Sequence, residues 1–475
     1  MKINNINGYI FGFVIVVFFS CGIPKTVQIN HQVELPKKYQ DTNQIGSLTL
    51  QQPKDFFQDT FLKKLIDTAI VRNFDLRIFT QKNVVANHDY LQSRGMLLPT
   101  VQYNSFFQQR KFGYYTMDDA GNRVTEFYPG KLIPTHLPDY FGGFQTNWEL
   151  DVWGKLKNKK KAAFLRLESS YQGRNLLKTV VVEKVASLYF ELLALDQELV
   201  SIRESIEIQK NAVEVLKVQK SSGVTNELSV KQFQALLHNY QSMEFEIMRK
   251  QQLIEYELNE MLGRYNLPVL RNMETLNNDS VMFVKQGVPS ELLNYRPDIK
   301  SAELELLAAK CDVISAKAAF YPTLNILGSI GLQSFDASLL WNFPKSVAYN
   351  FLGGVTGPLI NRSAIKAHFN RASAGQMEAI LNYQKTILKA YFEVSSELSN
   401  LKYLNEMKQL KLKEVDELYL SLNISKELFI TGKASYLEVL TIQKNALQSK
   451  MEIIDLQKAE FLSKIRLYKA LGGGW

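Results

Sequence analysis

GGFQTNWEL, at residues 142–150, is the most informative stretch of the chain because its side chains alternate with a period of two. The even-numbered positions carry glycine, aromatic, threonine or leucine side chains, and the odd-numbered positions are mostly amide or carboxylate residues. A β-strand places such alternating residues on opposite faces. About ten residues with one apolar and one polar face match a membrane-spanning strand. A soluble sheet with one covered face has the same alternation, so this stretch by itself leaves both open.

Three further stretches alternate in the same way, so the chain is predicted to hold four strands. They lie near residues 99–109, 140–151, 322–333 and 347–357. The 11% aromatic content and a lipoprotein-like N-terminus favour membrane strands. Four strands cannot close a barrel, and an open edge in lipid leaves backbone N–H and C=O groups unpaired. Three copies would supply twelve strands, within the bacterial range, so a homotrimer is predicted.

The chain also repeats itself. Four short motifs recur in the same order, with offsets between 202 and 223 residues, which indicates a tandem duplication of a unit of about 210 residues. The matched pairs are Leu98-Pro99-Thr100-Val101 with Tyr321-Pro322-Thr323-Leu324, Leu188-Tyr189-Phe190-Glu191 with Ala390-Tyr391-Phe392-Glu393, Ser222-Gly223-Val224 with Thr431-Gly432-Lys433, and Leu262-Gly263 with Leu471-Gly472.

Each unit contains a long helical hairpin as well as strands. From Val181 to Leu216 the apolar residues follow one another in steps of four and three, with only Gln209 out of class. Such steps are typical of a heptad seam between packed helices. A helix over residues 155–221 would be roughly 100 Å long. The sequence therefore predicts a helical coiled coil that continues from the strands.

The N-terminus is predicted to direct the chain out of the cytoplasm. Residues 1–20 carry one lysine and then an apolar run that is too short to span a bilayer as a helix, which is typical of a signal peptide. Ser20-Cys21-Gly22 follows and resembles a bacterial lipoprotein signal, so Cys21 is the predicted lipidation site. A plain signal peptide with an incidental cysteine is the alternative. Residues 21–54 are then an extended, lipid-anchored segment.

Composition excludes several other classes of protein. The 475 residues have a net charge of +9, 46% hydrophobic and 22% charged residues, and a mean hydropathy of −0.15. These values exclude a collagen-like or disordered chain and a polytopic helical membrane protein. The mild, interspersed positive charge does not predict nucleic-acid binding. Two cysteines cannot form a disulfide framework, and Cys311 is expected to pack as a small apolar side chain.

No residue set converges on catalysis or on a cofactor. The five histidines lie far apart, without a pair at helical spacing, so no metal site is predicted. Neither a phosphate-binding glycine loop nor a nucleophile elbow is visible, so the chain is not predicted to be an enzyme and needs no cofactor. Lysines 155, 157, 159, 160 and 161 form a basic run that is either a solvated face or a contact with anionic lipid headgroups.

A family resemblance rests on several specific motifs. The segment Leu292-Leu293-Asn294-Tyr295-Arg296-Pro297-Asp298-Ile299, with Ala316–Pro322, Asn73–Arg77 and Trp148–Gly154, is similar to the TolC/OprM-type outer membrane factor family. The likeness covers residues 35–472. It implies a homotrimer with a twelve-stranded barrel in the outer membrane and a helical tunnel through the periplasm. It also implies docking with a periplasmic adaptor and an inner-membrane transporter of the RND type. Physically, Pro297 and Asp298 suit the first turn of a helix, and the motif is expected to start that helix and to do no chemistry.

The resemblance also assigns functional positions. Gly223, Val224 and Gly432 would form the periplasmic tips that meet the adaptor, and both glycines suit the positive φ of a tight helix–helix turn. Leu437, Glu438 and Thr441 would form the pore constriction. Family members often carry an aspartate where Thr441 stands, so this chain lacks that acid. Glu438 is three residues away, roughly 60° around the helix, and closure is expected to depend on Leu437.

The resulting domain scheme has two repeats. The first repeat spans residues 55–265 and contains the hairpin 155–262. A linker at 266–290 leads to the second repeat at 291–475, with a helix at 297–320 and the hairpin 361–471.

The predicted function is the outer-membrane duct of a tripartite efflux system that exports small molecules. One alternative is the duct of a type I protein secretion system. A remote alternative is a lipid-anchored periplasmic coiled-coil scaffold.

Overall fold

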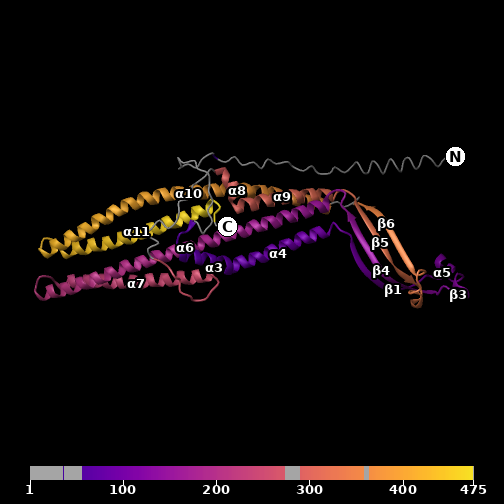
Figure 1. Cartoon of the computed structure of the whole chain (residues 1–475), viewed down its shortest axis with the longest axis horizontal. Coiled ribbons are helices and arrows are strands. Elements are labelled where there is room, and N and C mark those ends of the chain that lie inside the picture. The colour runs from indigo at the N-terminus through magenta and orange to yellow at the C-terminus, as the bar shows by residue number, and fades with distance from the viewer. Residues whose placement is uncertain (1–35, 37–55, 273–288, 358–362, 474–475) are drawn as a thin grey trace. The chain divides into compact units, whose positions relative to one another are not determined.

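The structure is a computed structural model that describes residues 36, 56–272, 289–357 and 363–473 (Figure 1). The predicted signal peptide and Cys21 lie outside the described residues. The chain divides into two compact units, and each contains parts of both sequence repeats. Unit 1 includes Val85–Leu167 and Leu304–Ile380, and unit 2 includes the described parts of His31–Val84, Glu168–Glu303 and Leu381–Trp475.

Unit 1 is built around a four-stranded antiparallel sheet with the order β1-β4-β5-β6. Its strands are β1 (Thr100–Lys111), β4 (His136–Leu150), β5 (Thr323–Ser334) and β6 (Val347–Thr356). The first two strands come from the first repeat and the last two from the second, so β4 and β5 join the repeats. Strands β1 and β6 are the two edges of the sheet within one chain.

The register gives the sheet one apolar and one polar face. Across the four strands, Tyr103 pairs with Phe144, Phe144 with Ile330, and Ile330 with Tyr349. All four side chains of this row are more than half exposed in the single chain. The neighbouring row consists of the polar residues Gln102, Gln145, Ser329 and Asn350. The period of two in the sequence therefore predicted both the strands and their faces correctly.

The segments between paired strands carry small elements of their own. Helix α5 (Met117–Asn122) and the hairpin of β2 (Glu126–Tyr128) and β3 (Lys131–Leu132) lie between β1 and β4. The short helix η3 (Ala337–Leu339) lies between β5 and β6.

Four helices contribute residues to both units, and two of them are very long. They are α4 (Phe74–Gly95), α6 (Lys155–Ser221), α9 (Pro297–Ala318) and α10 (Ser363–Ile430). Helices α6 and α10 have 67 and 68 residues, so each is roughly 100 Å long. Unit 2 also contains α3 (Thr60–Arg72), α7 (Glu227–Met261), η2 (Pro289–Glu291), α8 (Leu292–Tyr295) and α11 (Tyr436–Ala470). Among the described residues, no helix is both long enough and apolar enough to cross a membrane.

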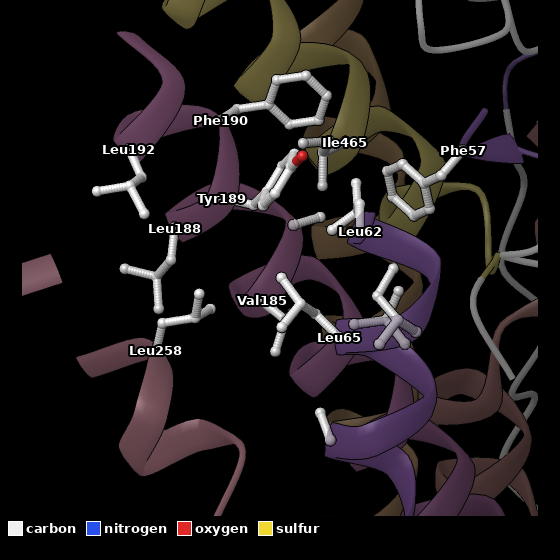
Figure 2. Packing of buried hydrophobic residues seen from close by; sticks show 14 of the residues in the cluster. Phe57, Leu62, Leu65, Val185, Leu188, Tyr189, Phe190, Leu192, Leu258 and Ile465 are labelled. Atoms are coloured by element: carbon white, nitrogen blue, oxygen red, sulfur yellow. The ribbon is translucent and has the colours of Figure 1, made fainter. Parts of the chain in front are cut away.

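The main core of unit 2 gathers side chains from α3, α6, α7 and α11 (Figure 2). Tyr189 and Phe190 of α6 are fully buried at its centre. The Phe190 ring stacks on Phe461 of α11 with ring centroids 4.7 Å apart. The Tyr189 hydroxyl donates a hydrogen bond of 2.8 Å to Asp59, whose carboxylate also caps the start of α3. Because the same cluster includes Leu258 of α7, it joins all four helices.

The heptad seam of α6 packs against α7 as its spacing predicts. Val213 and Leu216 lie with Val230 and Phe233 of α7 in one buried cluster. Gln209, the residue out of class, is fully buried. Its side-chain amide donates a hydrogen bond of 2.9 Å to the backbone carbonyl of Phe233. Its carbonyl oxygen has no partner among the described residues. The seam therefore contains one buried side-chain amide whose N–H group is hydrogen-bonded and whose carbonyl oxygen is not.

Gln209 supplies a test of this packing. Replacing it with methionine removes an unpaired buried oxygen together with the hydrogen bond to the Phe233 carbonyl and keeps most of the volume, so we expect the melting temperature to stay about the same. Replacing it with alanine leaves a cavity and should cost about 2 kcal/mol. Thermal unfolding followed by circular dichroism distinguishes the two variants. If the methionine variant melts as low as the alanine variant, filling the volume at this position is not sufficient for stability.

Candidate functional site

The turns of the two helical hairpins have the same geometry. In the first turn, Gly223 N–H donates to the carbonyl of Lys220 and Val224 N–H donates to that of Gln219. In the second, Gly432 N–H donates to Phe429 and Lys433 N–H donates to Leu428. Gly223 and Gly432 have φ values of +74° and +72°, which confirms the positive φ predicted for both.

Each of these turns is followed at once by a capped helix. The Asn226 side chain accepts from the Ser229 N–H at 3.0 Å and begins α7, while Ser435 begins α11. Val224 is 73% exposed at the first turn. An added Cβ atom at Gly223 or Gly432 would meet nothing within 4 Å. Both turns are thus hydrogen-bonded in the backbone and open around their glycines.

The three predicted constriction residues share the first turns of α11. The Glu438 carboxylate accepts from the Ser435 backbone N–H at 2.7 Å, and Ser435 in turn caps the Glu438 N–H. In this reciprocal capping box, the Glu438 carboxylate stabilises the start of the helix. Thr441 donates a hydrogen bond of 2.8 Å to the Leu437 carbonyl, and Leu437 is 52% exposed. Leu437 is therefore the free apolar side chain of the three.

A buried arginine, Arg296, ties the second repeat together just before α9. Its guanidinium donates to the Ala470 carbonyl at 2.9 Å, to both oxygens of Asp298 at 3.0 and 2.6 Å, and to Glu393 at 2.7 Å. Burial acts to lower the pKa of Arg296, but its bonds to the two carboxylates outweigh this and the pKa is raised. Arg296 thus stays charged while it joins the start of α9 to α10 and to the end of α11.

The sequence motif around Arg296 starts a helix and also makes a long-range contact. Pro297 occupies the first position of α9, as predicted. In addition to the predicted helix start, Arg296 satisfies the end of the hairpin through its bond to the Ala470 carbonyl. The missed signal is the basic residue itself, since a buried arginine needs several acceptors that lie far away in the sequence.

The first repeat has a corresponding contact at Asn73. Its side-chain amide donates to the Met261 carbonyl at 3.0 Å, just as Arg296 donates to Ala470. Each acceptor lies two residues before a glycine of positive φ, namely Gly263 and Gly472. A Cβ atom on either glycine would lie 2.8 or 2.9 Å from a carbonyl of the residue preceding Asn73 or Arg296. We call these two contacts the hairpin latches.

The junction between strands and helices in unit 1 depends on Asp151 and Trp153. Asp151 accepts from the backbone N–H groups of Leu156 and Lys157 at 2.8 and 2.7 Å and so caps α6. The Trp153 indole donates to the Pro322 carbonyl at 2.7 Å, and its ring stacks on Tyr321 with centroids 4.8 Å apart. These contacts lock the β4–α6 connection of one repeat to the α9–β5 connection of the other.

Cys311 and the first lysine of the basic run both make packing or ionic contacts within the chain. Cys311 is buried against Ala162, Ala308 and Leu165 and packs as a small side chain, as expected. Burial raises the pKa of its thiol. Lys155 of the basic run forms an ion pair with Glu149, while Lys159 is exposed. No group of three metal-binding side chains comes together within the described ranges.

Residues 65–264 and 288–473 match the outer membrane efflux protein family. The chain belongs to this family. Its members are efflux ducts of the outer membrane rather than enzymes, so this chain is an outer-membrane efflux component that extends into the periplasm. The two matched ranges correspond to the two halves in which the latches recur.

Curated outer membrane efflux proteins align along most of the chain. The cation efflux system protein CusC of Escherichia coli O6:H1 is 28% identical over 427 residues, which covers 89% of this chain and 88% of that protein. The solvent efflux pump outer membrane protein SrpC of Pseudomonas putida is 29% identical over 439 residues, with 90% and 88% covered. SilC of Salmonella typhimurium, described as a probable outer membrane lipoprotein, is 26% identical over 430 residues, with 89% and 88% covered.

Solved outer-membrane channels have the same fold. A crystal structure of CusC superposes with a TM-score of 0.83 at 24% identity and covers 94% of this chain and 99% of that one. The open state of the Neisseria gonorrhoeae MtrE channel gives a TM-score of 0.80 at 22% identity, covering 95% and 98%. The predicted fold class is thereby confirmed.

The two latches are predicted to contribute unequally to the free energy of unfolding. Arg296→Ala would leave Asp298 and Glu393 without their buried partner, so we expect a loss of about 3–5 kcal/mol. Asn73→Ala removes two neutral hydrogen bonds, one to the Met261 carbonyl and one from the Leu76 N–H, and should cost about 1–3 kcal/mol. Apparent melting temperatures of the purified protein test both. Lys389→Gln, at an exposed lysine beside Glu393, serves as a charge control and should melt like the wild type. Equal melting of the Arg296 variant and this control would contradict the latch.

Proposed function

We propose that three copies of this chain form the outer-membrane duct of a tripartite efflux system. The observation that carries this proposal is the four-stranded sheet with one apolar face and two edges, β1 and β6. In lipid, each edge must pair with another strand. Pairing β1 of one copy with β6 of the next closes the sheet at three copies, with twelve strands in the barrel. The long helices would continue as a tunnel through the periplasm.

Small molecules or ions are the proposed cargo, in preference to proteins. The printed names of CusC and SrpC refer to a cation and to solvents, and the name of a third relative, from Pseudomonas putida, refers to toluene. Because these relatives are named for different small solutes, they support an efflux duct over the duct of a type I protein secretion system. Energy would come from an inner-membrane transporter of the RND type, so the duct itself would need no cofactor.

The hairpin turns are the proposed docking points for a periplasmic adaptor. Gly223, Val224 and Gly432 lie at turns of matched geometry, as expected if one partner surface recognises both repeats. In the same scheme, Leu437 would narrow the pore with Thr441 beside it. Glu438 would support that turn through its capping box and would supply little free negative charge.

We also propose roles for the N-terminal segment and for the two repeats. Cys21 would be lipidated after removal of residues 1–20 and would anchor the segment 21–54. The repeats 55–265 and 291–475 would form the wall of the duct on either side of the linker 266–290. The name of SilC, a probable outer membrane lipoprotein, supports the lipid anchor by analogy.

Cysteine crosslinking at the turns tests the docking and separates the two systems. A side chain at Gly223 or Gly432 has free space, so Gly223→Cys and Gly432→Cys should cost only about 1 kcal/mol for the positive φ. We expect both variants to crosslink to a periplasmic adaptor in intact cells. A co-purifying proton-driven transporter would support efflux, while a co-purifying ATPase would support protein secretion. A matched cysteine at exposed Tyr265, away from the turns, should form no adduct.

Conductance tests the constriction. Leu437→Ser should open the pore and raise single-channel conductance in planar bilayers, because it removes the apolar side chain proposed to pack at the axis. Leu420→Ser, at an exposed leucine of α10 outside the proposed constriction, provides the control. If the Leu437 variant conducts no better than the wild type, Leu437 does not form the constriction.

A further inference from the structure

We propose that the contact between the two repeats inside one chain is repeated between neighbouring copies, with α10 of one copy packed against α7 of the next. This inference rests on the proposed trimer and assigns the helices and side chains that join its copies outside the sheet. All residues concerned belong to unit 2. Within that unit, α6 and α11 lie between α10 and α7 in the view of Figure 1.

The contact inside the chain joins α6 of the first repeat to α11 of the second. Phe190 of α6 stacks on Phe461 of α11, and Ile465 of α11 lies in the same buried cluster. At the edge of this cluster, Nζ of Lys469 lies 3.4 Å from a carboxylate oxygen of Glu183. The contact therefore consists of an apolar centre flanked by one ion pair.

The duplication gives each of these residues a counterpart on an outer helix. The match of Leu188-Tyr189-Phe190-Glu191 with Ala390-Tyr391-Phe392-Glu393 relates α6 to α10 by 202 residues. The match of Leu262-Gly263 with Leu471-Gly472 relates α7 to α11 by 209 residues. Both offsets extend to the adjacent turns without a gap, because each of these helices is continuous there.

The apolar counterparts are exposed in the single chain. Phe190 corresponds to Phe392 of α10, and Ile465 corresponds to Tyr256 of α7. Phe190 and Ile465 are 0% and 1% exposed, whereas Phe392 and Tyr256 are 59% and 50% exposed. Large side chains at positions that are buried in the other repeat indicate an interface that one chain leaves unfilled.

The ion pair has a counterpart with its charges reversed. Glu183 corresponds to Lys385 of α10, and Lys469 corresponds to Glu260 of α7. Both counterparts are exposed, and neither forms an ion pair with another described residue. The exchange of sign keeps opposite charges facing each other if α10 meets α7 as α6 meets α11. Such complementarity between two faces of the same chain favours a second copy as the partner.

The contact between copies differs from the internal one at its centre. Gln252 of α7 stands at the position of Phe461, so the ring stack is not repeated. Gln252 is exposed and lies one turn before Tyr256, so the Phe392 ring packs against the Gln252 stem and the Tyr256 ring. Because two different faces meet, each copy uses both once, and three identical contacts close a ring.

Disulfide crosslinking of the full chain tests which helices meet. In Lys385→Cys combined with Glu260→Cys, we expect oxidation to join neighbouring copies into dimers and trimers that reduction returns to monomers on denaturing gels. Each single variant should give neither product. Lys385→Cys combined with Lys250→Cys is the matched control, because exposed Lys250 lies on α7 ten residues, or about 15 Å, from Glu260. This control pair should not crosslink.

Charge reversal tests the ion pair itself. Lys385→Glu or Glu260→Lys places like charges opposite each other at all three contacts, so each should lower the temperature at which the purified trimer dissociates. The two reversals combined restore opposite charges and should recover most of that loss. Lys426→Glu on α10 is the control, because Lys217, its counterpart in the first repeat, pairs with Glu214 of its own helix. This variant should dissociate like the wild type.

The outcomes separate this inference from the proposed trimer. Native mass spectrometry in detergent first determines whether the wild type is a trimer, and a monomer would refute both. A trimer whose Lys385/Glu260 cysteine pair does not crosslink, or whose combined reversal is no more stable than the single reversals, would overturn only the α10–α7 contact. Crosslinking of these cysteines to another protein in intact cells would overturn the second copy as the partner. If the double cysteine variant does not fold, the reversal series decides.

Discussion

Backbone hydrogen bonding at the edges of the sheet is the constraint that shapes this molecule. Strands β1 and β6 present N–H and C=O groups that no other strand of the same chain satisfies among the described residues. Water satisfies such groups on a soluble protein, but the interior of a lipid bilayer cannot. An outer-membrane location therefore makes a single chain incomplete. Each repeat contributes only two strands, so one chain supplies four strands with two open edges. The same constraint therefore requires several copies of the chain to pair those edges in lipid.

Duplication accounts for much of the internal organisation. Asn73 and Arg296 stand at equivalent points of the two repeats, and each holds the carbonyl two residues before a positive-φ glycine. The two latches share geometry but differ in chemistry. The neutral amide makes one bond to its hairpin, whereas the arginine also gathers Asp298 and Glu393. The second repeat therefore uses a charged side chain for a contact that the first repeat makes with a neutral amide.

The site residues differ in how far the sequence could predict them. The glycines at 223 and 432 were predictable because a tight helix–helix turn requires a conformation that favours glycine. Gln209 stood out as an exception to the heptad, but its hydrogen bond to Phe233 required knowledge of which helix packs there. Arg296 and Asp151 looked like ordinary charged residues near helix starts. Their partners lie on other elements or several residues away, so only the folded chain reveals their roles.

Local periods in the sequence predicted the four long strands and the heptad-bearing helices. A period of two defined four strands and their two faces, and steps of three and four defined the long helices, because side-chain direction along a strand or helix is a local property of the backbone. Which separate parts meet was settled only by the tertiary structure. It joined β4 to β5 across the repeats, placed the Tyr189 hydroxyl on Asp59, and paired Lys469 with Glu183. Such contacts depend on how distant segments pack, and no local pattern records that.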